Sequence, residues 1–96
     1  MLTLVFIGEK RALQLNKTYR GATYIPNVLS FRLDSHNGEI YITPRTAYKE
    51  CHKFNMSPSG YIGFLFIHAL LHLKGYTHSD TMEKVEKRYM KQFELT

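Results

Sequence analysis

The amino-acid sequence predicts an α+β domain (mixed α/β), in which a small sheet of about three strands is covered by four helices. The chain has 96 residues, 44% of them hydrophobic, and no internal repeat, so residues 1–96 are expected to form one domain around one core. An Asn37-Gly38 pair between two strand-like segments indicates a hairpin. The pairs Thr43-Pro44 and Ser57-Pro58 indicate two helix starts, each with a hydroxyl that caps the free amides and a proline whose missing N–H costs nothing there.

The chain opens with a predicted strand over residues 1–7, which are rich in β-branched and aromatic side chains. A helix is predicted over residues 9–19, because Ala12, Leu15 and Tyr19 fall on one helical face.

A hairpin follows a loop that contains a glycine and a proline. Its predicted strands cover residues 28–33 and 39–43, joined by a turn over residues 34–38. The turn is expected there because Asn37-Gly38 tolerates the positive φ angles that tight turns demand.

Three helices are predicted in the second half of the chain, over about residues 44–54, 58–74 and 82–95. The middle one is expected to pack across the sheet as a buried helix, since its apolar stretch is too short to span a membrane. In the last one an apolar stripe indicates a core face rather than a cofactor site. The stripe consists of Met82, Val85, Tyr89 and Phe93.

Three histidines indicate a metal site on this core helix and the turn after it. His68 and His72 are four residues apart and therefore lie on one helical face. Gly75 is expected to end the helix in a left-handed conformation, so that the chain turns back and brings His78 to the pair. Three ligands leave one position of tetrahedral zinc open, as catalytic sites require. The alternative is that the histidines form ordinary hydrogen bonds in the core, and the spacing favours the metal.

Charge and cysteine content restrict the partners and the compartment. Thirteen Lys and Arg against eight Asp and Glu give a net charge of +5, spread along the chain, which favours a polyanionic partner on a folded basic surface. Cys51 is the only cysteine and cannot form an internal disulfide, and the first apolar run is unlike a secretory signal. We therefore expect a cytoplasmic protein.

The histidine spacing is also typical of metzincin peptidases. In those enzymes the residue after the first histidine is the glutamate that acts as general base. Here that position is Ala69, so ordinary metallopeptidase chemistry is disfavoured.

Four segments together resemble the YbeY family of bacterial endoribonucleases, over nearly the whole chain. Residues 68–78 read His-Ala-Leu-Leu-His-Leu-Lys-Gly-Tyr-Thr-His, close to the family pattern His-Gly-x-Leu-His-Leu-x-Gly-Tyr-Asp-His. Residues 15–20 (Leu-Asn-Lys-Thr-Tyr-Arg), 26–31 (Pro-Asn-Val-Leu-Ser-Phe) and 38–43 (Gly-Glu-Ile-Tyr-Ile-Thr) are similar to three further family motifs. Their order along the chain is also that of the family.

The resemblance implies a zinc-dependent, single-strand-specific endoribonuclease that acts in ribosomal RNA maturation and ribosome quality control. One Zn²⁺ would be held by His68, His72 and His78, with RNA or ribosome-associated proteins as partners and no membrane. Arg20 and His72 are the candidate catalytic residues. Arg20 matches the family's arginine, and its planar fork suits bidentate binding of a phosphate, although a surface arginine at a helix end is the alternative.

Two positions depart from the family pattern. Thr77 stands where the family has an aspartate that could orient a ligand or move a proton, and Ala69 stands where it has a glycine. The chain also begins at what looks like the family's second strand, which suggests a short variant lacking an N-terminal strand and helix. Such shortening would expose an edge that favours self-association.

Two other functions stay open on the sequence alone. One is a metal-dependent hydrolase of another substrate, such as a peptide. The other is a catalytically impaired, zinc-stabilised module that binds RNA or ribosomes. Four further residues are left out of the site because each has a commoner structural explanation: Ser30, His36, Cys51 and His52.

Overall fold

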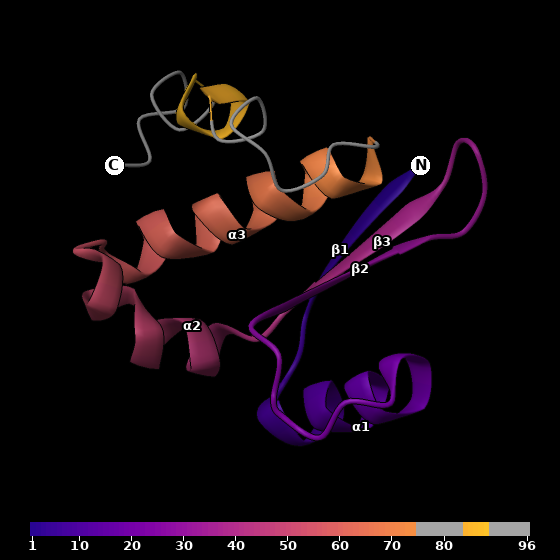
Figure 1. Ribbon diagram of the computed structural model, residues 1–96, viewed down its shortest axis with the longest axis horizontal. Helices are drawn as coiled ribbons and strands as arrows, with labels where there is room; N and C mark the ends of the chain where they lie inside the picture. The colour runs from indigo at the N-terminus through magenta and orange to yellow at the C-terminus, as the bar shows by residue number, and fades with distance from the viewer. Residues whose placement is uncertain (75–83, 89–96) are drawn as a thin grey trace.

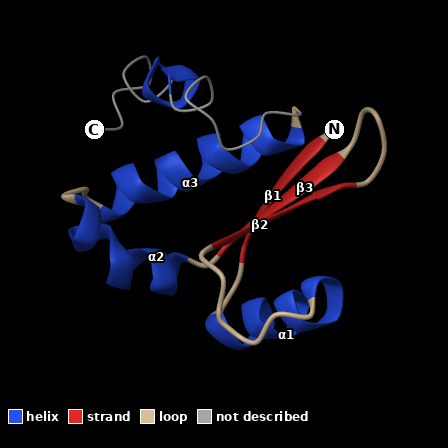
Figure 2. Cartoon of the chain, viewed as in Figure 1, coloured by secondary structure: helices blue, strands red, loops and turns tan. Residues whose placement is uncertain are grey.

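The computed structural model describes residues 1–74 and 84–88. The elements in chain order are β1 (Leu2–Phe6), α1 (Glu9–Arg20), β2 (Val28–Arg32), β3 (Gly38–Ile42), α2 (Pro44–Glu50), the 3₁₀ helix η1 (Cys51–Phe54) and α3 (Pro58–Leu73). Residues 84–88 are also helical. The predicted class is confirmed, since a three-stranded sheet is covered by helices (Figures 1 and 2).

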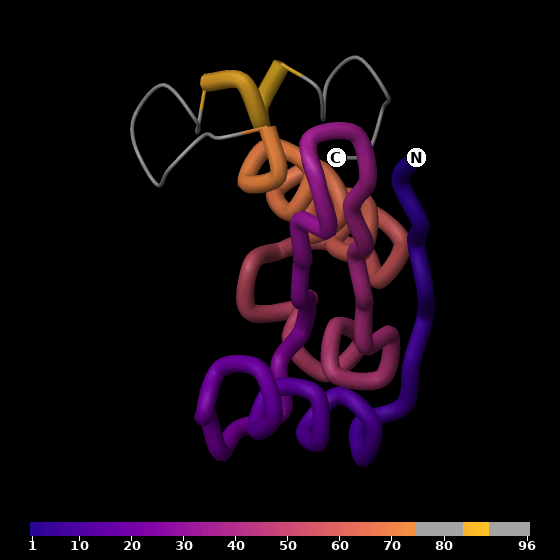
Figure 3. The backbone as a smooth tube through the Cα atoms, turned by 90° about the vertical axis from the view of Figure 1, so that its right-hand side faces the viewer, coloured from indigo at the N-terminus to yellow at the C-terminus, as the bar shows by residue number. Residues whose placement is uncertain are grey.

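The sheet has the strand order β1-β3-β2. β2 and β3 form the predicted antiparallel hairpin, with Val28 opposite Ile42. β1 lies parallel to β3 on its other side, as the tube in Figure 3 shows. In this pair Leu2 lies opposite Gly38. The sequence did not predict this parallel pairing. Because β3 pairs with both other strands, β2 is an outer strand of the sheet.

The sheet lies between two helices, with α3 across one face and α1 on the opposite side (Figure 1). α3 is the central helix of the fold, because its apolar side chains are buried in three directions. Ala69 packs on the sheet at Ile40 and Ile42. Further buried contacts join Tyr61 and Leu65 to Ala47 and Cys51 of α2 and η1, and Ile67 and Leu71 to Val85.

Within the described residues, no single helix is long and apolar enough to cross a membrane. Pro44–Phe54 and Pro58–Leu73 satisfy that criterion only when taken together, and they meet at an angle of 103°.

The two hydroxyl-proline pairs begin helices by different means. At the start of α3 the Ser57 hydroxyl accepts a hydrogen bond from the Gly60 amide at 3.0 Å, as predicted. At the start of α2 the predicted side-chain cap is wrong, because the Thr43 side chain is buried and forms no cap hydrogen bond. α2 nevertheless begins at Pro44, whose fixed φ suits the first helical position.

The three residues predicted to share one face of α1 differ in burial. Ala12 and Leu15 are buried, but Tyr19 is 66% exposed, and its ring contacts Phe31 of β2 with the ring centroids 5.2 Å apart. Asn16 is buried in its place, and its amide donates to the Tyr24 carbonyl at 3.0 Å. This hydrogen bond fixes the loop that leads from α1 to β2.

The hairpin turn lies where it was predicted, but the reason given for it is wrong. Gly38 does not have a positive φ and instead begins β3. The turn is closed by the Asp34 carboxylate, which accepts hydrogen bonds from the amides of His36 and Asn37, both at 2.8 Å. A Cβ at position 38 would lie 3.1 Å from the Leu73 side chain of α3, so glycine fits there without a shift of that side chain.

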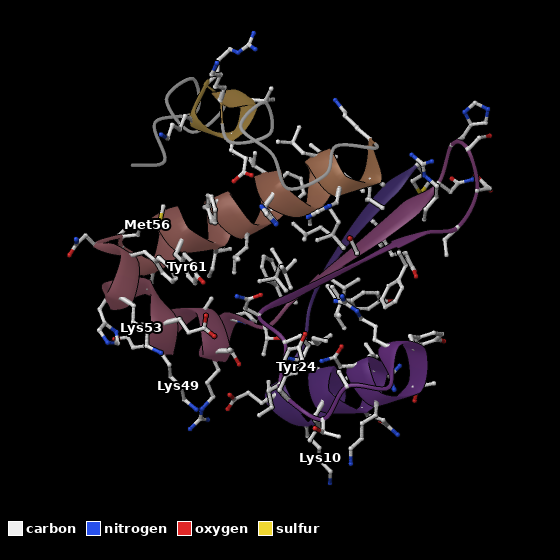
Figure 4. All side chains as sticks on the ribbon, viewed as in Figure 1. Lys10, Tyr24, Lys49, Lys53, Met56 and Tyr61 are labelled. Carbon is white, nitrogen blue, oxygen red and sulfur yellow. The ribbon has the colours of Figure 1, made fainter. Side chains whose placement is uncertain are left out.

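Tyr61 joins α3 to α2 through a buried polar group. Its hydroxyl donates to the Glu50 carboxylate at 3.1 Å and accepts from the Asn27 amide at 3.3 Å. Figure 4 shows the side chain pointing from α3 toward α2. Burial, followed by the hydrogen bond to Glu50, raises the pKa of Tyr61 to about 12.

We expect Tyr61→Phe to lower the free energy of unfolding by about 1 kcal/mol at neutral pH, because Glu50 loses a hydrogen-bond donor. Below the unfolded tyrosine pKa of about 10 that difference should be constant. Between pH 10 and 12 it should shrink, because the phenol ionises in the unfolded parent before it does in the folded one. Urea unfolding of both proteins at several pH values measures this. The exposed Tyr48 gives the control Tyr48→Phe, and an equal loss in both variants would contradict the assignment.

Candidate active site

A cavity of about 580 Å³ lies where α1, β2 and α3 meet. α1 contributes its last two residues, and β2 contributes side chains along an outer strand of the sheet. α3 contributes His68, Ala69 and His72. The full lining is Tyr19, Arg20, Val28, Ser30, Phe31, His68, Ala69 and His72.

His68 and His72 lie one turn apart on α3 and converge as predicted. Their Nε2 atoms are 3.1 Å apart, and the two ring planes are inclined at 78°. Both side chains are half-buried, and the His68 ring also packs near Phe64, with the ring centroids 5.8 Å apart. Two imidazole nitrogens therefore lie side by side at the wall of the cavity.

This geometry fits a zinc ion. Two nitrogens that each lie about 2.0–2.1 Å from a tetrahedral zinc ion are about 3.3 Å apart, close to the observed separation of the two Nε2 atoms. Within residues 1–74 and 84–88, no group of three His, Cys, Asp or Glu side chains could hold a metal. The third predicted ligand, His78, lies outside the described residues, as do Gly75 and Thr77.

Arg20 lies in the same cavity as the two histidines, although 48 positions separate it from His68 in the sequence. It is the last residue of α1, which ends because Gly21 adopts a left-handed conformation with φ 65°. The Gly21 and Ala22 amides bond back to the carbonyls of Lys17 and Asn16. The exposed guanidinium is thus held at a defined helix end and available to a bound phosphate.

The residues of the motif at positions 15–20 have two different structural roles. Leu15 and Asn16 are buried and hold α1 and the following loop together. Tyr19 and Arg20 line the cavity. The motif at residues 26–31 is divided in the same way, since Leu29 is buried whereas Ser30 and Phe31 line the cavity.

The residues left out of the site on sequence grounds differ in position. Ser30 does line the cavity, so its exclusion was too strict. His36 and His52 are exposed, in the hairpin turn and in η1, and Cys51 is buried with its thiol donating to the Tyr48 carbonyl at 3.3 Å. None of these last three lines the cavity.

Glu86 was missed entirely. Its carboxylate lies 3.1 Å from Nδ1 of His68, and the residue is 6% exposed. A signal was present in the sequence, because Glu86 is four residues after Met82 and one after Val85, inside the predicted apolar stripe. A carboxylate at such a position requires a buried partner.

Comparisons with known proteins identify the family of this chain. The model of the family described as Endoribonuclease YbeY matches residues 1–95. Endoribonuclease YbeY of Alkaliphilus metalliredigens is 32% identical over 106 residues, covering 99% of this chain and 68% of that protein. Endoribonuclease YbeY of Mycoplasma mycoides is 32% identical over 94 residues, covering 86% and 57%.

A solved structure shows the same fold. The solution structure of TM1509 from Thermotoga maritima matches with a TM-score of 0.70 and 29% identity, over 94% of this chain and 65% of that one. The mixed α/β fold of this chain is thus shared with a known protein. The chain belongs to the YbeY family. It spans less than two thirds of the length of several of these relatives.

Proposed function

We propose that this protein is a zinc-dependent endoribonuclease that hydrolyses single-stranded RNA. The observation that carries the proposal is the shared cavity, which brings a convergent histidine pair and an arginine together from distant parts of the chain. Its relatives are named endoribonucleases, which gives the substrate class. Ribosomal RNA maturation and ribosome quality control in the cytoplasm are the proposed setting.

His68, His72 and His78 would hold one Zn²⁺. When bound, zinc polarises a phosphoryl oxygen and brings the pKa of a bound water toward neutrality. Arg20 would bind the scissile phosphate by two parallel N–H hydrogen bonds and offset the negative charge that develops as the phosphodiester is attacked. Ala69 offers no carboxylate beside the first histidine, which argues against peptidase chemistry.

Two aromatic rings at the cavity support the proposed preference for single-stranded RNA. Tyr19 and Phe31 line the cavity next to Arg20, with their ring planes inclined at 59° and Tyr19 largely exposed. An exposed ring beside a phosphate-binding arginine offers a stacking surface for an unpaired base. A base within a duplex is already stacked and cannot use it.

Tyr19→Ala is therefore expected to weaken binding of single-stranded RNA by about tenfold, consistent with the loss of one base-stacking contact. Tyr19→Phe should keep most of the affinity, because stacking needs the ring rather than the hydroxyl. Fluorescence anisotropy with a labelled oligonucleotide measures both. Tyr48→Ala on the exposed side of α2 is the control, and an effect of that variant equal to that of Tyr19→Ala would contradict a stacking role.

The function is tested by incubating the zinc-loaded protein with single-stranded RNA, double-stranded RNA and an unstructured peptide. We expect cleavage of the single-stranded RNA only. Cleavage of the peptide instead would select a different hydrolase. RNA binding without turnover, unchanged in Thr77→Asp, would select a catalytically impaired binding module.

A further inference from the structure

We propose that Glu86 is a positioning residue for the metal site, which acts by fixing the ring of His68. The inference deepens the proposed function, because it rests on zinc binding at the histidines. Its basis is the contact between Glu86 Oε1 and His68 Nδ1 at 3.1 Å, formed between residues 18 positions apart. Both side chains are largely withdrawn from solvent, at 8% exposed for Glu86 and 18% for His68.

The contact determines which nitrogen of His68 carries a proton. An ionised carboxylate only accepts hydrogen bonds, so Nδ1 of His68 must be the donor. The neutral ring then has its lone pair on Nε2, which is the atom that faces Nε2 of His72. The nitrogen aimed at the metal position is thus the one able to bind a metal, and the carboxylate makes it a stronger donor to the ion.

Packing of the neighbouring residue Val85 places Glu86 beside His68. Val85 is buried against Ile67 and Leu71 of α3. His68 lies between these two residues in the sequence. That apolar contact holds residues 84–88 against α3 and carries the Glu86 carboxylate to the ring. Lys84, Lys87 and Arg88 are exposed, so Glu86 is the charged side chain of these five residues that is directed inward.

The inference also bears on Thr77. The family pattern places an aspartate there, and its loss removes one carboxylate beside the third histidine. Glu86 supplies a carboxylate to the first histidine from a different segment of the chain. Orientation of the ligand set therefore does not depend on position 77 alone.

The test measures zinc affinity by competition with a chromogenic chelator in the parent, Glu86→Gln, Glu86→Ala and Lys87→Ala. Loss of a group that orients a metal-binding histidine lowers metal affinity by about 10- to 100-fold. We expect a loss in that range for Glu86→Ala and a smaller one for Glu86→Gln, whose amide oxygen still accepts from Nδ1. Lys87→Ala, in the same helical segment, should bind zinc as the parent does.

A second readout separates positioning from a merely structural role. In the metal-free parent, the ¹⁵N spectrum of the histidine side chains should show His68 protonated at Nδ1, and Glu86→Ala should lose that preference. Thermal unfolding of the metal-free proteins shows whether Glu86→Gln is folded at the temperature at which its zinc affinity is measured. Parent-like zinc affinity in both Glu86 variants would overturn the inference, as would a parent His68 protonated at Nε2.

RNA cleavage is measured on the same samples, so that failure of the proposed nuclease function can be distinguished from failure of the positioning role of Glu86. Zinc binding that depends on Glu86 in a protein that cuts no RNA would overturn the proposed nuclease and leave the positioning role standing. RNA cleavage by a protein whose zinc affinity is unaffected by substitution of Glu86 would overturn the positioning role and leave the proposed nuclease standing.

Discussion

His72→Ala is expected to abolish zinc retention and, with it, RNA cleavage. His72 provides one of the two converging nitrogens, and its removal leaves two of the three proposed ligands, too few for a stable catalytic zinc site. We expect less than about one tenth of an equivalent of zinc after dialysis and a loss of cleavage rate of more than about 100-fold. Metal analysis and cleavage of a labelled single-stranded RNA, on the same preparation, measure both effects.

His52→Ala is the matched control for this variant. His52 is exposed on η1 and does not line the cavity, so the same substitution there should leave zinc content and cleavage unchanged. Circular dichroism of both variants checks that the fold is intact. A His72→Ala protein that is folded and cuts RNA at the parent rate would rule out the proposed role of this histidine.

The second large effect is expected for Arg20→Ala, which should reduce the cleavage rate by about 100- to 1,000-fold while leaving zinc content unchanged. Arg20 lines the cavity beside the histidines but is not among the proposed metal ligands. Its loss therefore removes stabilisation of the developing phosphate charge and not the metal. Arg20→Lys should recover part of the rate, because lysine keeps the charge but cannot bind a phosphate bidentately.

Lys17→Ala is the control for Arg20, since Lys17 is an exposed basic residue in the last turn of the same helix and does not line the cavity. It should have only a small effect, through a lower net charge. If both variants lose activity to the same extent and the loss disappears at low salt, then Arg20 contributes general charge and not a specific phosphate contact.

The features of the fold that the sequence predicts are those set by nearby residues. Helix periodicity and the Ser57-Pro58 start define α3, and the four-residue spacing of the histidines places both rings on one face of it. The hairpin could likewise be located from the polar residues between two strand-like segments. Its actual stabilisation by Asp34 was not evident, because the pattern suggested a glycine conformation that Gly38 does not adopt.

Contacts between distant segments were not predictable from such patterns. The parallel pairing of β1 with β3 depends on where the chain returns to the sheet after α1 and β2, and local periodicity carries no information about it. Tyr19 shares a helical face with Ala12 and Leu15 in the sequence pattern, yet Tyr19 is exposed and Asn16 is buried. The contact between Glu86 and His68 needs the packing of Val85 on α3 before the two side chains meet.

Arg20 shows how a family motif and a structure complement each other. The physical chemistry of arginine alone left a surface residue at a helix end as an alternative, and the motif favoured phosphate binding. The fold supplies the missing spatial information, because Arg20 at the end of α1 lines the same cavity as His68 and His72 of α3. The same packing accounts for the presence of Tyr19 and Phe31, whose motifs gave no indication that their rings would meet.

The most direct test of a zinc-dependent nuclease at this cavity is a metal titration of the unmodified protein. The chain is stripped with a chelator, returned to metal-free buffer and titrated with Zn²⁺, while cleavage of a fluorescent single-stranded RNA is followed. We expect no cleavage by the stripped protein and a rise that saturates at one equivalent of zinc. Cleavage by the stripped protein at the full rate, or saturation of zinc binding without any cleavage, would contradict the proposed function.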